Sequence, residues 1–534
     1  MWERTAILYG VDVGRFADSN DDGIGDFRGL VRRLDHVAAL GADCVWILPC
    51  FPSAMRDNGY DVDNYYAIHP ALGDLRDFAD FVAAARERGL RVLLDLVVNH
   101  TSDRHPWFQA ARRDPRSRYR DYYIWRDEPP PASDQETIFP GEEQGTWTYD
   151  ERAGAFFHHR FYHFQPDLDA ANREVRGEIE RIMDFWLSFG VDGFRLDAAS
   201  HLVEEKGHPE IEPRDRHEVL RELFAYLRSR RPDGVLMAEA DVPPGRLPAF
   251  VSGGDQVNVM LNFLLNNYLW LALATERAEA IDRGLALLPA WPGRGQWANF
   301  LRNLDEADLE QLSGEKRAAV MRVFAPEASM RIYGRGIRRR LVPMLGADRR
   351  RLQLAFGLLF ALPGAPVIVY GDEIGMGENL SQPGREAVRP PMQWSAEKNG
   401  GFSRAPRERL VAPAIEEGEF AYDRINVAAQ EADPGSLLRV VRALARIRRD
   451  HPEIATGECR QIEAGSSAVW ARVYRGPSSR LLAAHNLSSR TVETALRPDA
   501  ALATEIGSGE RLDIVDGLIR RRLPPYGSLW ARLE

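Results

Sequence analysis

The fold is first indicated by a five-residue stretch, Gly193-Phe194-Arg195-Leu196-Asp197, in which an apolar run ends in an arginine and an aspartate. In a β-strand, residues two positions apart point to the same face, so Arg195 and Asp197 are expected side by side. Taken alone, such a pair could be a structural salt bridge. It is also typical of the strand ends at which parallel barrels build their sites.

Similar short apolar runs recur along the chain, and turn residues and a helical pattern follow each of them. Seven runs predict β-strands, at residues 6–13, 43–48, 91–98, 192–196, 234–238, 297–302 and 366–370. Between them, residues 75–88 and 175–189 carry apolar side chains at a helical spacing. Strands that alternate with helices in this way predict a sheet of parallel strands.

Seven strands fall one short of a (β/α)8 TIM barrel, the α/β fold that this alternation favours. The sixth strand is expected within residues 256–263, although Asn258 and Asn262 weaken the strand pattern there. We therefore predict a barrel made of residues 1–100 and 173–452.

Two segments depart from the alternation. Residues 101–172 are rich in aromatic, charged and proline residues and are far longer than an ordinary connection after a strand. They predict a subdomain inserted after strand 3 that walls the site, because long excursions after barrel strands lie at the C-terminal face. Residues 453–534 contain short alternating runs separated by Gly, Pro and Ser, which predict a C-terminal antiparallel β-sandwich domain.

The composition excludes several classes of partner. The 534 residues carry a net charge of -10 and have a pI near 5.8, which gives no basic face for nucleic acid or for a membrane surface. The longest apolar stretch, residues 352–370, is interrupted by polar and proline residues, so a buried helix and strand are expected rather than a membrane span. Two triple-arginine runs, 338–340 and 349–351, are interpreted as solvated helix faces.

The cysteines indicate a reducing compartment. Cys44, Cys50 and Cys459 have no disulfide or metal-ligand spacing, so we expect reduced, buried thiols and a cytoplasmic protein. The N-terminal residues do not have the pattern of a secretion signal. The sequence leaves open whether the chain forms a homo-oligomer.

Two further carboxylates follow predicted strands. Glu239 closes the run 235–239, and Asp305 comes shortly after the run 297–302. In a barrel, these positions converge with Asp197 on one mouth. Cleavage of a glycosidic bond needs one carboxylic acid to protonate the leaving oxygen and one carboxylate to attack the anomeric carbon or to activate water. Because Arg195 should keep Asp197 ionised, we predict that Asp197 attacks and that Glu239 protonates.

The motifs of the chain resemble those of a known family, glycoside hydrolase family 13, the α-amylase superfamily. Four segments of the chain resemble the four core motifs of this family: Asp95-Leu96-Val97-Val98-Asn99-His100, Gly193 to Asp197, Glu239 and Asn303-Leu304-Asp305. The segment Gln165-Pro166-Asp167-Leu168 resembles an additional motif of the α-glucosidase and oligo-1,6-glucosidase branch. Within the family, residues 300–306, 330–341, 371–376 and 389–394 are most similar to the trehalose synthases.

The resemblance implies a role for each matching residue. It makes Asp197 the nucleophile, Glu239 the acid/base and Asp305 the acid that orients the sugar hydroxyls. The residues implied to bind the substrate are Asp57, Tyr60, His100, Arg195 and Arg389. One position departs from the family: Leu304 stands where the last core motif has a histidine that contacts the glucose hydroxyls. Because leucine cannot make that hydrogen bond, turnover or substrate choice is expected to differ.

A second constellation indicates a metal site. The run from Asp18 to Asp26 has oxygen-bearing side chains at positions 1, 3, 5 and 9 of a calcium loop and Gly23 at position 6, but it has Gly29 at position 12, where such loops have glutamate. The resemblance implies a structural Ca2+ ion in this loop. Its implied ligands are Asp18, Asn20, Asp22, Asp26 and the carbonyl of Ile24.

Three functions stay open at this point. The first is a retaining isomerase of the trehalose synthase type, which would interconvert maltose and trehalose through a covalent glucosyl-enzyme. The second is an α-glucosidase or transglucosidase that uses the same residues on terminal α-glucosyl units. The third is a carbohydrate-binding homologue that has lost catalysis, which only Leu304 suggests. In each case, the expected partner is a small α-glucoside.

Overall fold

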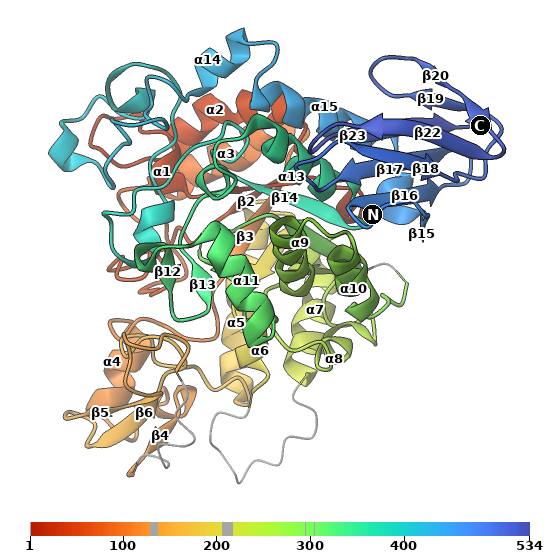
Figure 1. The fold of residues 1–534 in the computed structure, drawn as a ribbon. Coiled ribbons are helices and arrows are strands. Elements are labelled where there is room, and N and C mark those ends of the chain that lie inside the picture. The colour runs from red at the N-terminus through yellow and green to blue at the C-terminus, as the bar shows by residue number, and fades with distance from the viewer. Residues whose placement is uncertain (1, 129–136, 205–216, 294, 304) are drawn as a thin grey trace.

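The structure is a computed structural model, and it describes residues 2–128, 137–204, 217–293, 295–303 and 305–534. Its centre is a closed barrel of eight parallel strands, in the order β1-β2-β3-β7-β8-β9-β10-β14, with β14 paired to β1 (Figure 1). The strands are β1 (Leu8–Val11), β2 (Cys44–Ile47), β3 (Arg91–Leu96), β7 (Gly193–Leu196), β8 (Val235–Ala238), β9 (Val259–Leu261), β10 (Gln296–Phe300) and β14 (Ala365–Val369). The predicted TIM barrel is confirmed.

The sixth barrel strand, β9, lies within the segment in which it was expected. The two asparagines that weaken its pattern flank it. Asn258 accepts a hydrogen bond from the Leu236 N–H (2.8 Å) and donates one to the Gly234 carbonyl (3.2 Å). The side chain therefore pairs with the backbone of β8, so an asparagine is tolerated at the edge of a buried strand.

Helices cover the outside of the barrel (Figure 1). The longer ones are α2 (Phe27–Leu40), α3 (Leu75–Glu87), α5 (Arg173–Ser188), α7 (Glu218–Arg230), α9 (Phe263–Thr275), α10 (Glu279–Leu287), α11 (Gly314–Phe324), α13 (Arg349–Ala361) and α15 (Leu437–Asp450). The chain also contains the shorter helices α1 (Val13–Phe16), α6 (Ala199–Leu202), α8 (Leu247–Val251), α12 (Leu341–Met344), α14 (Val427–Ala432) and α16 (Glu453–Thr456). Both predicted helices are present, as α3 and α5. Because helices cover them, the barrel strands are almost wholly buried and read as continuous apolar runs.

The segment between β3 and β7 forms a small unit of its own. Helix α4 (Pro106–Arg113) is followed by a three-stranded antiparallel sheet with the order β4-β6-β5. Its strands are β4 (Trp125–Arg126), β6 (Ala155–His158) and β5 (Trp147–Asp150). Figure 1 shows the unit projecting from one side of the barrel. Three consecutive prolines of this segment, residues 129–131, lie outside the described residues.

The C-terminal region consists of two antiparallel sheets, as predicted. The larger sheet contains β15 (Glu458–Gln461), β16 (Val469–Arg475), β17 (Arg480–Asn486), β23 (Ser528–Leu533), β19 (Ala503–Glu505) and β20 (Arg511–Leu512), and the smaller contains β18 (Val492–Leu496), β22 (Leu518–Leu523) and β21 (Ile514–Val515). One cluster of buried side chains, including Val473, Leu482 and Leu523, joins them. A further three-stranded sheet follows β10, with β11 (Ala307–Asp308), β13 (Gly336–Ile337) and β12 (Arg331–Ile332).

One of the two arginine interpretations is wrong. Residues 349–351 begin helix α13 with largely exposed side chains, as expected. Arg340, in contrast, precedes α12 and is fully buried, where it donates to the Tyr370 carbonyl (2.7 Å) and to Asp372 (2.8 Å). A buried guanidinium is stable there because backbone and carboxylate acceptors meet its donors. Within the described residues, no helix has both the length and the apolarity needed to cross a membrane.

Candidate active site

A cavity of about 260 Å³ opens at the C-terminal end of the barrel strands. The predicted site residues that line it are Asp57, Tyr60, His100, Arg195, Asp197, Glu239 and Asp305. Arg389 does not line the cavity, but it contacts Asp305 from behind. The structure thus brings together eight residues that are spread over more than 300 positions of the chain.

The barrel hydrogen bonding places the two central carboxylates. The Asp197 N–H donates to the Leu96 carbonyl (3.1 Å), and the Glu239 N–H donates to the Leu196 carbonyl (3.0 Å). Each acid therefore extends the ladder by one residue beyond its strand and faces the mouth. Ala198, the next residue, has a positive φ of 48°, which is uncommon for alanine, and its N–H donates to Glu239 Oε2 (3.2 Å).

A single guanidinium joins three carboxylates beneath the cavity. Arg195 Nη1 lies 2.6 Å from Asp197 Oδ1 and 2.8 Å from Asp95 Oδ1. Its Nη2 lies 2.7 Å from Glu239 Oε2. Sequence reasoning quoted Asp95 within a motif but gave it no role. A charged residue inside the apolar run of β3 was the signal that could have identified it.

The electrostatics correct one expectation. Arg195 does lower the pKa of Asp197, but burial and the nearby Glu239 and Asp95 outweigh it and raise that pKa well above its ordinary value. Burial likewise raises the pKa of Asp95 to about 6. Three carboxylates share one positive charge, so the cluster readily holds a proton. A retaining mechanism needs one proton there, on the acid, with the nucleophile ionised.

We expect these raised pKa values to appear in the dependence of kcat/KM on pH. Because the pKa of Asp197 is raised, the nucleophile should be neutralised at a higher pH than an ordinary aspartate, so kcat/KM should decline at a correspondingly higher pH. An ordinary aspartate would stay ionised to about pH 4. Asp95→Asn removes a neighbouring negative charge and should move the acid limb to lower pH. The measurement is kcat/KM from pH 4 to 8, and an acid limb near pH 4 in the unmodified protein would contradict this account.

Three residues form the inner wall of the cavity. Asp57 is buried and accepts a hydrogen bond from Gln165 Nε2 (2.8 Å), and burial raises its pKa to about 6. The Tyr60 hydroxyl donates to Asp95 Oδ2 (3.4 Å), and the Tyr60 ring lies 5.8 Å from the guanidinium carbon of Arg195. His100 Nε2 lies 3.2 Å from the Tyr60 carbonyl. This wall offers an aromatic face and polar groups, which suit one pyranose ring.

Asp305 lies opposite, between two arginines. It forms an ion pair with Arg389, and Arg385 Nε lies 3.6 Å from its Oδ1. Burial would raise the pKa of Asp305, but Arg385, Arg389 and Arg195 outweigh it and lower that pKa to about 2. Asp305 therefore stays ionised and can accept hydrogen bonds in the cavity. Sequence reasoning missed Arg385, for which no motif gave a signal. Leu304 lies outside the described residues.

Comparison with known proteins identifies the family. A sequence model described as the alpha amylase catalytic domain matches residues 13–457. The chain belongs to the α-amylase family. A trehalose synthase of Thermus thermophilus is 40% identical over 532 residues, which are 99% of this chain and 55% of the relative, so the chain spans about half the length of that protein.

A second relative and a solved structure agree with this family. A trehalose synthase of Pimelobacter sp. (strain R48) is 38% identical over 549 aligned residues and covers 100% of this chain and 96% of the relative. The crystal structure of the alpha-amylase from H. orenii is 27% identical, with a TM-score of 0.81 over 100% of both chains. The family fold therefore extends over the C-terminal sheets as well as the barrel.

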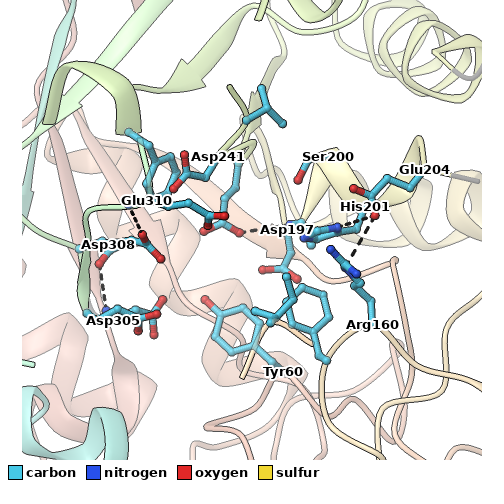
Figure 2. Close-up of a pocket in the computed structure, with 18 of the residues that line it drawn as sticks. Tyr60, Arg160, Asp197, Ser200, His201, Glu204, Asp241, Asp305, Asp308 and Glu310 are labelled. Carbon is cyan, nitrogen blue, oxygen red and sulfur yellow. Dashed lines mark hydrogen bonds and ion pairs between the residues drawn. The ribbon is translucent and has the colours of Figure 1, made fainter. Parts of the chain in front are cut away.

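The mouth of the site carries charged side chains that the family motifs do not include. Figure 2 shows Asp241, Asp308 and Glu310 on one side of Asp197, and Arg160, His201 and Glu204 on the other. His201 Nδ1 lies 2.8 Å from Glu204 Oε2. Burial and the adjacent Asp308 raise the pKa of Asp241 well above its ordinary value. His201 lies in the short helix α6 and Asp308 in the short strand β11, and the other four residues come from loops. No local pattern predicts the positions of such segments.

The loop of residues 18–26 lies apart from the cavity and hydrogen-bonds largely to itself. Asp18 accepts bonds from the Asn20, Asp21 and Gly23 N–H groups (2.8–2.9 Å) and from the Ser403 hydroxyl (2.6 Å). These four bonds match the capacity of a carboxylate. Asp22 and Asp26 each accept two, so their oxygens keep lone pairs for a cation. The donor chemistry suits calcium, most clearly at Asp22 and Asp26.

Proposed function

We propose that the chain is a retaining enzyme that interconverts maltose and trehalose and releases some glucose by hydrolysis. The observation that carries the proposal is the contact of Asp197 and Glu239 with the same guanidinium, that of Arg195. Such a contact favours the short separation of about 5 Å that retaining enzymes use, rather than the wider gap that admits a water molecule. The trehalose synthases of Thermus thermophilus and Pimelobacter sp. among the relatives support trehalose as a product.

In the first step, an Asp197 oxygen attacks the anomeric carbon of the non-reducing glucose of maltose. The bond to O4 of the second glucose breaks, and Glu239 gives its proton to that oxygen. The products are a glucosyl ester on Asp197 and a free glucose molecule. The negative charge that Asp197 loses on becoming an ester appears on Glu239, and Arg195 stays paired with Asp95 and Glu239.

In the second step, the free glucose turns and presents its anomeric hydroxyl. Glu239, now ionised, takes the proton of that hydroxyl, and the oxygen attacks the anomeric carbon of the ester. The bond to Asp197 breaks, so the carboxylate returns and trehalose forms. Asp305 and Asp57 hold hydroxyl groups of the retained glucosyl unit during both steps.

Water is the competing acceptor, and this gives the second candidate function. The charged mouth includes His201, Glu204 and Glu310, whose polar groups can hydrogen-bond water close to the ester. If water attacks instead of glucose, the same residues act as an α-glucosidase. The fate of the free glucose therefore decides between isomerisation and hydrolysis.

The test is the product mixture from maltose. Purified protein is incubated with maltose, and the sugars are separated and quantified over time. We expect trehalose as the main product with a minor amount of glucose, and maltose from trehalose in the reverse assay. Glucose alone would support the hydrolase, and no turnover of any α-glucoside would support a binding protein.

Leu304 provides a separate prediction. Leu304→His restores the hydroxyl contact of the family motif, so kcat/KM on maltose should rise about tenfold, the value of one added hydrogen bond of roughly 1.4 kcal/mol. Leu304→Asn is a control for polarity without the ring. An unchanged rate in the histidine variant would mean that the remaining contacts already hold the glucose.

We also propose that the 18–26 loop binds a structural calcium ion. Asp22 and Asp26 supply its carboxylates, and Asn20 and the Ile24 carbonyl add two further oxygens. Asp18 completes the set by giving up one of its four hydrogen bonds. At a hundredfold excess over Kd, calcium should raise Tm by roughly 2 °C in a chain of this size. Asp22→Ala should abolish the rise, whereas Asp21→Asn should keep it, because Asp21 lies outside the set. Equal Tm values in calcium and EDTA would refute the ion.

A further inference from the structure

A second cavity of about 520 Å³ lies next to the active site. It shares two lining residues with the first cavity, Asp57 and Arg385. Its volume is within the range of sites that hold small ligands. None of the catalytic carboxylates Asp197, Glu239 and Asp305 lines it.

Asp57 and Arg385 form the partition between the two cavities, and contacts from neighbouring residues hold each of them in place. Asp57 is fixed by the hydrogen bond from Gln165, and Arg385 forms two hydrogen bonds with Glu306 (2.7 and 3.1 Å). The guanidinium carbon of Arg385 also lies 5.7 Å from the ring of Tyr333. A ligand of the second cavity is therefore a molecule separate from the glucosyl unit in the first.

The lining of the second cavity suits a sugar. Tyr162 and Tyr333 supply aromatic rings, and their hydroxyl oxygens lie 3.4 Å apart. Glu386 supplies a carboxylate that also pairs with Arg15, and Arg56 supplies a guanidinium that also pairs with Asp103. Polar groups held in place in this way, together with apolar ring faces, recognise the polar edge and the apolar face of a pyranose.

The backbone at the rim provides an independent observation. Met55 and Asn58 have positive φ values of 58° and 50°, and Gly59 follows at 95°. Met55 is also one of the few large apolar side chains that are strongly exposed, at 41%, in the described part of the chain. Left-handed residues cluster at sites that clamp ligands, because their strain persists only where the surrounding structure imposes it.

We propose that this cavity binds a free hexopyranose, glucose, as a second sugar site next to the donor subsite. Met55 covers one face of the ring, and the polar groups of the lining hold its hydroxyls. Because Asp57 and Arg385 face both cavities, glucose in the second cavity fixes the partition and alters binding of the substrate in the first. The site therefore senses the free glucose that hydrolysis releases, and to that extent the regulatory role rests on the proposed function.

The binding test uses wild-type protein and glucose alone, which is not turned over without a glucosyl donor. Isothermal titration should give two glucose molecules per chain. Ala71→Trp places an indole in the second cavity, which Ala71 lines, and should reduce the number to one. Ala67→Trp, in the same loop but outside both cavities, should leave two. A single site in the wild type, or two sites in a folded Ala71→Trp variant, overturns the proposal.

A second measurement does not depend on the folding of any blocking variant. The full chain is labelled with ¹³C-methyl methionine, and its NMR spectrum is recorded during titration with glucose. The Met55 methyl signal, which is identified by its absence in Met55→Leu, should shift. A signal that stays fixed at saturating glucose overturns the site. Both measurements need no turnover, so a failure to form trehalose would refute the proposed function and leave this test intact. If both hold, glucose inhibition of maltose turnover should be mixed in the wild type and competitive in Ala71→Trp.

Discussion

Replacing Asp197 with alanine is expected to lower the turnover of maltose by at least about 10⁴-fold, because the bond-forming group is lost. No neighbour can take its place. Asp95 contacts the same guanidinium but is fully buried and does not line the cavity, and Asp305 is held by its own arginines. The variant should fold normally. A carboxyl group whose pKa is raised on folding costs stability when it is ionised, so its loss at pH 7 should leave Tm unchanged or higher.

The measurement is kcat on maltose together with Tm by calorimetry. Asp423→Ala, at an exposed aspartate away from the cavity, is the matched control and should stay within twofold of the wild type. Turnover of Asp197→Ala within tenfold of the wild type would remove Asp197 from the chemistry. A large drop in Tm would mean that the residue acts mainly by holding Arg195 in place.

Replacing Glu239 with glutamine is the second change for which we expect a large loss of turnover. The amide keeps the shape of the side chain but cannot donate the catalytic proton, so turnover of maltose should fall by about 10²–10⁴-fold. With α-glucosyl fluoride the first step should continue at a near-normal rate, because fluoride leaves without a proton. The ester on Asp197 then accumulates, since attack by glucose or water still lacks its base.

The two substrates make this prediction specific. The rate of the first step, measured in a single turnover, is compared on maltose and on α-glucosyl fluoride for the wild type, Glu239→Gln and Asp241→Asn. Asp241 lies two residues further along and also lines the cavity, so its variant controls for changes in the shape of the mouth. An equal loss on both substrates in Glu239→Gln would assign Glu239 to binding rather than to proton transfer.

The barrel and its acids could be predicted because both depend on local patterns. Buried parallel strands must be apolar, and a residue just past such a strand must lie at the mouth, which fixed the positions of Asp197 and Glu239. β9 could be located despite Asn258 because seven strands had been found and a TIM barrel needs an eighth. The buried Arg340 could not be predicted, since its acceptors, Tyr370 and Asp372, lie about 30 residues away along the chain.

The charge state of the site also depended on the fold. The pair Arg195 and Asp197 alone indicates an ionised nucleophile. Asp95 and Glu239 come from other strands, and only the closed barrel brings them to the same guanidinium. For the same reason, no sequence motif could predict Arg385 or the second cavity that it borders. They depend on how loops meet above the strands.

The account rests on a glucosyl ester at Asp197, and trapping that ester tests it most directly. Glu239→Gln is mixed with α-glucosyl fluoride, quenched in acid and digested, and the peptides are examined by mass spectrometry. We expect one glucosyl adduct, on the peptide that contains Asp197, at Asp197 itself. The absence of an adduct, or an adduct at Asp95 or Asp305, would contradict the account.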